Sequence, residues 1–370
     1  MGLRLERRVD RPRWLTVAVP LASVAVALFV GGVVIALSGN DAVDTYARIL
    51  ERGFTSRGAF TATLTAATPL LFTGLAAAAA FRMGVFNIGG EGQLIVGAIG
   101  ASGAAIALGD SASGPVLIVA MVVAGAAAGA AWAGIAAVLR AYLGTNEIIT
   151  TLMLNYLAIN LATYLVFGST SAWRELTGTG LMFPQGKKIP DAARWPGIDF
   201  GNFTVGLGFF LGTAIAIGLF VLFRATRYGF SVRVIGDEPR AARYAGMRTR
   251  RTILSLLALS GAVAGIGGAS DVGGTRYLLD PKALGQAGYG YAGIVVAALA
   301  RLNPLAVVGV SILMGGLANA GRALQGPDFP AGLVGTLQGL LLVCTLAGEL
   351  FARYRVRRTA PTPATPGAAA

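Results

Sequence analysis

The chain has 370 residues, of which 55% are hydrophobic and 13% are charged, and its net charge is +13. Soluble proteins carry about 25% charged residues, and apolar runs of about twenty residues recur along this chain, so it is predicted to be a polytopic helical membrane protein. It contains no histidine, which excludes Ser-His and Cys-His catalysis and HExxH zinc sites. We expect no enzyme, no metal site and no bound cofactor.

Ten apolar runs predict an all-α fold with about ten transmembrane helices. The first run follows five arginines and is about 23 residues long, which exceeds the apolar core of a signal peptide, so we interpret it as a retained helix. The predicted spans are 15–37, 59–81, 92–108, 115–138, 148–168, 203–223, 253–270, 286–300, 304–319 and 331–351.

Three regions follow from these spans. Residues 1–14 are predicted to form a basic tail, and residues 15–351 a transmembrane domain with a long cytoplasmic loop at 224–252. Residues 352–370 end in a Pro/Ala-rich stretch that is typical of disorder.

The distribution of basic residues predicts the topology. If the N-terminus is cytoplasmic, 20 of the 30 lysines and arginines lie in inside segments and 10 lie in outside segments. This bias follows the positive-inside rule and places both termini in the cytoplasm. The excess of positive charge therefore does not indicate nucleic acid, since no basic stretch is interleaved with aromatic residues.

Ten spans divide into five and five, and an odd number in each half would invert one half relative to the other. Such inverted repeats are common in transporters. "GGEGQLIVGAIGA" in the first half and "GYGYAGIVVAALA" in the second are faintly similar. Inside the spans, the glycine pairs Gly125/Gly129, Gly261/Gly265 and Gly335/Gly339 predict close helix packing.

The first polar cluster lies in "RMGVFNIGGEGQLIVGAIGA" and contains Asn87, Glu91 and Gln93. A carboxylate at membrane depth is costly unless it is paired or hydrated, and the glycines around it let the backbone leave helical geometry. Glu91 could therefore face a translocation path, pair with Arg82 in a cytoplasmic turn, or cap freed backbone amides. These three interpretations remain open.

The second cluster lies in "GTNEIITTLMLNYLAIN" and contains Asn146, Glu147 and Asn155. Thr145 could cap the helix that begins here, and Glu147 is favourable near the positive helix end. Thr151 and Asn155 are four residues apart and share one helix face. The asparagines inside the span could form hydrogen bonds between packed helices or line a pore.

The third feature is the basic loop that contains "GDEPRAARYAGM". Pro239 in a first turn, alanines in the body and Gly246 at the end predict a short helix. Such a helix could dock into a partner's groove, and the alternative is a basic loop resting on anionic lipid. In the outer loop 169–202, Trp173 and Trp195 are predicted to be interfacial anchors.

"FNIGGEGQLIVGAIGA", "GTNEIITTLMLNYLA" and "ATRYGFSVRVIGDEPRAARYAGM", in this order, resemble membrane permeases of bacterial ABC importers. The resemblance covers about residues 15–351 and is to the ribose/branched-chain amino acid permease superfamily, within it the nucleoside/simple-sugar subgroup. It implies a multi-pass protein of the bacterial inner membrane. The three lysines precede Lys, Ile and Ala, so the chain has no P-loop of its own.

The resemblance implies that ATP is bound by two separate ATPase subunits. It also implies a second permease subunit, the same or paralogous, and an extracellular substrate-binding lipoprotein. Asn87, Glu91, Gln93, Asn146, Glu147 and Asn155 would belong to the translocation path or to a core polar motif. The ATPase-coupling helix would comprise Asp237, Glu238, Pro239, Arg240, Ala241, Ala242, Arg243, Tyr244, Ala245 and Gly246.

The expected function is therefore nucleoside import by an ATP-driven ABC importer, with sugar import as the alternative. An ion-coupled secondary transporter, in which Glu91 and Glu147 would carry the coupling ion, is a further alternative. An intramembrane enzyme lacks the nucleophile and base pair it would need.

Overall fold

The computed structural model describes residues 2–7, 13–324 and 332–359. The chain divides into two compact units, one of residues 43–334 and a smaller one formed by residues 1–42 with 335–370. Helices dominate both units, and the described strands are four short segments. The predicted all-α class is confirmed.

The smaller unit contains the two ends of the chain. Helix α1 (Arg13–Leu37) and helix α14 (Leu333–Arg353) approach closely where a Cβ on Gly348 would lie 2.1 Å from the Ser23 hydroxyl. Strands β1 (Gly2–Arg7) and β4 (Tyr354–Thr359) form an antiparallel pair that the sequence analysis did not predict. Residues 360–370 of the predicted disordered tail lie outside the described residues.

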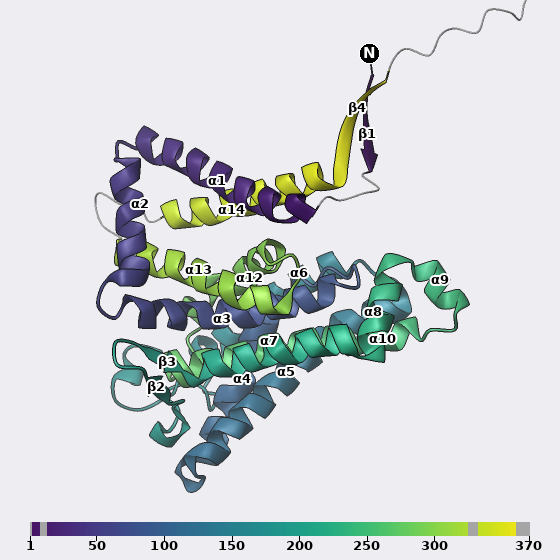
Figure 1. Ribbon diagram of the computed structural model, residues 1–370. Helices are drawn as coiled ribbons and strands as arrows, with labels where there is room; N and C mark the ends of the chain where they lie inside the picture. The colour runs from purple at the N-terminus through teal and green to yellow at the C-terminus, as the bar shows by residue number, and fades with distance from the viewer. Residues whose placement is uncertain (1, 8–12, 325–331, 360–370) are drawn as a thin grey trace, which may run out of the picture. The chain divides into compact units, whose positions relative to one another are not determined.

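The larger unit is built from twelve α-helices within the described residues (Figure 1). Their bounds are α2 Ala42–Leu50, α3 Ala59–Phe81, α4 Gly90–Leu108, α5 Gly114–Leu143, α6 Glu147–Thr163, α7 Leu207–Ala225, α8 Arg227–Asp237, α9 Pro239–Tyr244, α10 Thr249–Asp271, α11 Pro281–Ala287, α12 Tyr289–Leu299 and α13 Pro304–Ala323.

Seven helices in the described residues are long and apolar enough to cross a membrane, or eight if the pair formed by Leu21–Leu37 and Ala42–Thr55 counts as one span. Ten were predicted. The predicted span 286–300 is replaced by the 11-residue helix α12, which follows the short helix α11 after a left-handed Gly288. Eleven residues extend about 16 Å, half of the hydrocarbon thickness, so α12 cannot cross alone.

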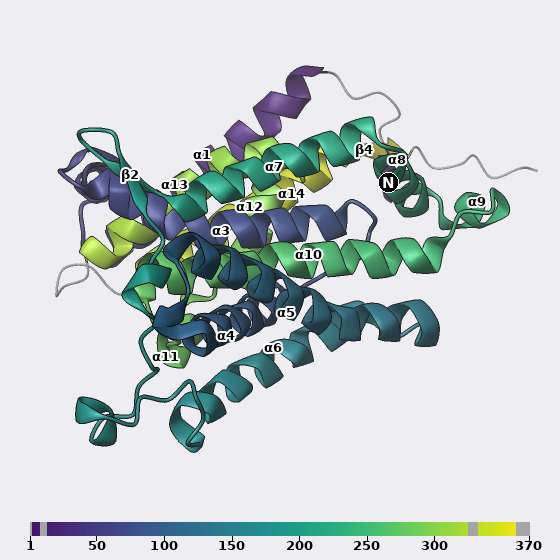
Figure 2. The same cartoon turned by 90° about the horizontal axis from the view of Figure 1, so that it is seen from below.

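Helix α3 lies at the centre of the larger unit, because 89% of its 18-residue apolar stretch is buried. It packs against α10, α12 and α13, while α4, α5 and α10 pack against one another (Figure 2). Short alanine and glycine side chains allow this layering, because van der Waals contact rather than hydrophobic exclusion holds helices together in lipid.

Helices α5 and α10 meet along a glycine seam, as the small-residue pattern predicted. A Cβ on Gly129 would lie 2.2 Å from the Gly261 carbonyl oxygen, and one on Gly265 would lie 2.1 Å from the Gly125 carbonyl oxygen. The two predicted pairs therefore face each other. Around the third pair, Gly335/Gly339, no described residue lies within 4 Å of a Cβ at either position, so its predicted close packing is not seen among the described residues.

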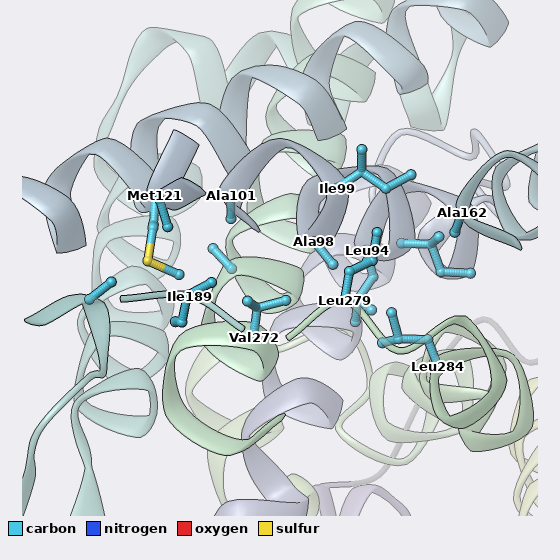
Figure 3. Close-up of a cluster of buried hydrophobic side chains, with 14 of the residues drawn as sticks. Leu94, Ala98, Ile99, Ala101, Met121, Ala162, Ile189, Val272, Leu279 and Leu284 are labelled. Carbon is cyan, nitrogen blue, oxygen red and sulfur yellow. The ribbon is translucent and has the colours of Figure 1, made fainter. Parts of the chain in front are cut away.

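A cluster of buried apolar side chains joins α4 and α5 to the outer loop and the segment after α10 (Figure 3). Ile189 from the loop lies against Met121 of α5 and Val272. Trp195 is only 6% exposed, and Trp173 donates its indole N–H to the Ile99 carbonyl oxygen at 3.1 Å. Both tryptophans pack the loop onto the helices, and their predicted position at the membrane interface stays a prediction.

Candidate functional site: a hydrogen-bonded break between two helices

The backbone between α3 and α4 leaves helical geometry over residues 82–89. Gly84 has a left-handed φ of +70°, which a glycine adopts without strain. The break exposes backbone amides and carbonyls that must find partners inside the protein. The sequence predicted such a discontinuous element here.

Asn87 satisfies much of this break through four hydrogen bonds. Its amide exchanges two bonds with Gln93, at 3.0 Å and 2.9 Å, so that the two side chains are reciprocally paired. The Asn87 Nδ2 also donates to the Ser260 hydroxyl at 2.9 Å, and its Oδ1 accepts from the Gly89 N–H at 3.0 Å. The Ser260 hydroxyl in turn donates to the Ala76 carbonyl oxygen at 2.7 Å. These hydrogen bonds connect the break to α3 and α10.

Helix α6 closes the break from the other side. Asn155 donates to the Ile88 carbonyl oxygen and accepts from the Gly92 N–H, each at 2.9 Å. Thr151, one turn earlier, accepts from the Ile88 N–H at 3.3 Å. The predicted shared face of Thr151 and Asn155 is confirmed, and it contacts backbone groups of the break.

Glu91 lies in the first turn of α4 and is 5% exposed. Its Oε2 accepts a hydrogen bond from the Gly290 N–H at the start of α12. Its Oε1 is buried and has no hydrogen-bond partner among the described residues. A Cβ on Gly290 would lie 2.1 Å from the Glu91 amide nitrogen, so the carboxylate joins α4 to α12 where the two backbones touch.

Arg82 does not pair with Glu91. Its guanidinium donates two hydrogen bonds to the Leu302 carbonyl oxygen, at 3.1 Å and 2.8 Å, and stacks over the Phe223 ring. Burial, and then the neighbouring charge of Arg233, lower the pKa of Arg82 below its usual value. The interpretation of Glu91 as a simple partner of Arg82 is therefore wrong.

Glu147 and Asn146 lie at the start of α6. Asn146, not Thr145, is the N-cap, and its side chain accepts from the Ile148 N–H at 2.9 Å. Glu147 is 6% exposed, forms an ion pair with Arg140 at 3.2 Å, and accepts from the Phe86 N–H at 3.4 Å. Five of the six predicted residues thus gather around the break, and Asn146 is an exposed cap beside it.

Sequence reasoning missed two groups of polar residues. Ser260 lies in an ordinary apolar stretch, and only its contact with Asn87 reveals its role. Asp271 and Arg276 form a buried hydrogen-bonded ion pair after α10. The stretch "SDVGGTR", with two opposite charges around a glycine pair in an apolar region, could have indicated the latter.

The predicted coupling segment forms the helix α9, with Pro239 in its first turn and a left-handed Gly246 after its end. It packs against α8 and the start of α10. Ala242 is fully buried, whereas Tyr244 is 95% exposed. Ala242 therefore faces the protein interior, while Ala241 and Ala245 are exposed together with Tyr244.

A cavity of about 200 Å³ lies between α3, α7 and the segment after α10, and hydroxyl groups and the aromatic residues Trp195, Phe209 and Tyr277 line it. These lining residues include Thr61, Thr65, Thr68, Thr204, Ser270, Thr275, Trp195 and Tyr277.

Comparison with known proteins gives the family. A glucose ABC transporter permease of Haloferax volcanii is 35% identical and covers 96% of this chain and 93% of its own length. A guanosine ABC transporter permease of Bacillus subtilis is 32% identical, and the match covers 81% of this chain and 84% of the relative. A nucleoside ABC transporter permease of Lactococcus lactis is 26% identical, and the match covers 86% of this chain and 87% of the relative. Residues 59–346 match the family described as branched-chain amino acid transport system / permease component, and the chain belongs to this family of transport subunits, which are not enzymes.

Proposed function

We propose that this chain is the permease subunit of an ATP-driven importer for nucleosides. The observation that carries the proposal is its similarity, over most of its length, to permeases whose names give guanosine and nucleosides as substrates. Glucose is the second candidate, because a glucose permease is 35% identical over 96% of this chain. Both solutes carry several hydroxyls, and the hydroxyl-lined cavity has groups that can bond to them.

The proposed assembly contains two ATPase subunits, a second permease subunit of the same or a paralogous sequence, and an extracellular binding lipoprotein. The solvent-exposed face of α9 around Tyr244 is the proposed ATPase contact. The bias of basic residues supports a multi-pass arrangement in the bacterial inner membrane with both termini in the cytoplasm.

The hydrogen bonds support a structural role for the polar motif. Asn87, Gln93 and Asn155 bond to backbone groups of the break, to one another, and to the hydroxyls of Ser260 and Tyr291. We propose that they hold the break rigid at the centre of the permease. Glu91 Oε1 is buried and has no hydrogen-bond partner among the described residues, so it is the atom of this motif that we propose to bind a water when the permease changes conformation.

The test is uptake by the complete transporter, copurified from its host with its ATPase and reconstituted into vesicles with the binding protein. Labelled guanosine should accumulate when ATP is inside the vesicles, and unlabelled glucose in excess should not compete. Uptake of labelled glucose alone would replace the nucleoside proposal by the sugar alternative. Uptake that requires an ion gradient and no ATP would contradict both.

A further inference from the structure

A large basic cavity lies where α5 ends and α10 begins, next to α9. It has a volume of about 910 Å³ and is lined by residues from these three segments. Five of the lining residues are arginines, and none of the lining residues, all within the described part of the chain, is acidic. The arginines are Arg140, Arg243, Arg248, Arg250 and Arg251.

Only part of this positive charge is balanced inside the protein. Arg140 pairs with Glu147 at 3.2 Å, and Arg250 lies over the Tyr142 ring at 5.5 Å. None of the ion pairs found in the described residues involves Arg243, Arg248 or Arg251. Three arginines therefore line one space without an ion-pair partner among the described residues.

The start of α10 adds further anion-binding groups. Its first turn holds no acidic residue, and Arg248 at its N-cap makes no side-chain capping bond. The first amides of a helix carry partial positive charge and favour an anion. The Thr249 hydroxyl lies in the same wall, is buried, and has no hydrogen-bond partner.

The cavity also has an apolar side. Tyr142 and Leu143 line it and are 58% and 70% exposed, and Ile253 lies opposite in α10. Helices α5 and α10 are both membrane spans by length and composition, so the ends that form the cavity lie at the level of the bilayer surface. A ligand at this place meets guanidinium groups and exposed apolar side chains together.

We propose that this cavity binds the phosphate headgroup of an anionic phospholipid, with the start of its acyl chains on Tyr142 and Leu143. A free phosphate would leave the apolar side of the cavity unused. Basic pockets between membrane helices are known to suit anionic lipid headgroups. With the proposed topology, the lipid would come from the cytoplasmic leaflet. The lipid site itself does not depend on which solute is transported.

The test measures lipid retention on the purified full-length chain by native mass spectrometry, with phosphatidylglycerol and phosphatidylcholine as probes. Phosphatidylglycerol should bind more tightly. In the variant Arg248→Gln/Arg251→Gln, its affinity should fall about 30-fold, because each basic residue near an anionic lipid contributes a factor of about five. The control Arg224→Gln/Arg227→Gln removes the same charge from the same loop outside the cavity and should keep the affinity.

A second measurement uses the unaltered chain. Phosphatidylglycerol should protect Arg248 and Arg251 from phenylglyoxal, and phosphatidylcholine should not, while Arg224 and Arg227 react equally in both. Equal affinity for the two lipids, equal losses in both double variants, or protection by inorganic phosphate as good as by phosphatidylglycerol would overturn the proposal. So would loss of ATPase binding in the cavity variant with lipid retention unchanged, which would identify a protein interface.

Discussion

At the scale of single residues, Asn87 is the side chain on which the break between α3 and α4 depends. Its four hydrogen bonds reach Gln93, Ser260 and the Gly89 amide, and it is 2% exposed. Water cannot easily replace these bonds, because the partners are themselves buried. Removing one side chain would thus leave several polar groups without partners.

We expect Asn87→Ala to destabilise the permease by about 2 kcal/mol, since a side-chain hydrogen bond inside a membrane protein contributes about 0.6 kcal/mol and four are lost. The midpoint of thermal unfolding in detergent measures the effect. The matched control is Asn160→Ala, because Asn160 is exposed on α6 and bonds only to the Tyr156 carbonyl of its own helix. An equal shift in both variants would contradict the assignment.

The sequence predicted a role for these polar residues, and it left open whether they line a path or bond to groups of the protein itself. Spacing along α6 placed Thr151 and Asn155 on one face, but the partner of that face depends on how α6 packs against α4. Glu91 and Arg82 are near each other in sequence, and an ion pair was a reasonable interpretation. Instead their partners, Gly290 and Leu302, come from distant parts of the chain, which no local pattern can reveal.

At the scale of elements, the glycine seam fixes the distance between α5 and α10. We expect Gly129→Ala to separate the helices or prevent assembly, because its Cβ would lie 2.2 Å from a backbone oxygen that cannot move alone. The control Gly134→Ala lies on the same helix with nothing within 4 Å. It should be neutral or stabilising by up to about 1 kcal/mol, as measured by yield and thermal unfolding of the purified chain.

The short helix α9 shows a similar limit of sequence reasoning. Proline at its start and glycine after its end predicted its position, because both residues act locally. Which face is exposed depends on α8 and α10, against which it packs. Ala242 is buried, so a substitution there would disturb this packing as well as any docking surface.

Tyr244 is therefore the better probe of ATPase docking. We expect Tyr244→Ala to reduce the ATPase that copurifies with the permease by about tenfold or more, since exposed tyrosines often dominate protein contacts. Tyr156→Ala, which removes a tyrosine that is 60% exposed on α6, is the control and should retain the ATPase. Undiminished ATPase recovery with Tyr244→Ala would show that α9 is not the docking helix.

At the scale of the whole molecule, one predicted span differs clearly from the described helices. Apolar runs identify α3, α5, α7 and α13 well, because each is a continuous hydrophobic helix. The run at 286–300 has the same composition, yet the left-handed Gly288 and the end of α12 at Leu299 cut it short. Composition alone cannot separate a full span from a short buried helix whose first turn contacts Glu91.

The topology of the whole chain can be tested with single cysteines, because Cys344 is its only native one. On a Cys344→Ser background, Tyr244→Cys and Met182→Cys place thiols at positions that are 95% and 82% exposed, in the basic loop and in the outer loop. In intact cells an impermeant maleimide should label the cysteine at position 182 and not that at 244. After permeabilisation, in cells that lack the proposed ATPase subunits, both should react. Labelling of position 244 in intact cells would reverse the orientation that the basic residues predict, and with it the side from which an ATPase could reach α9.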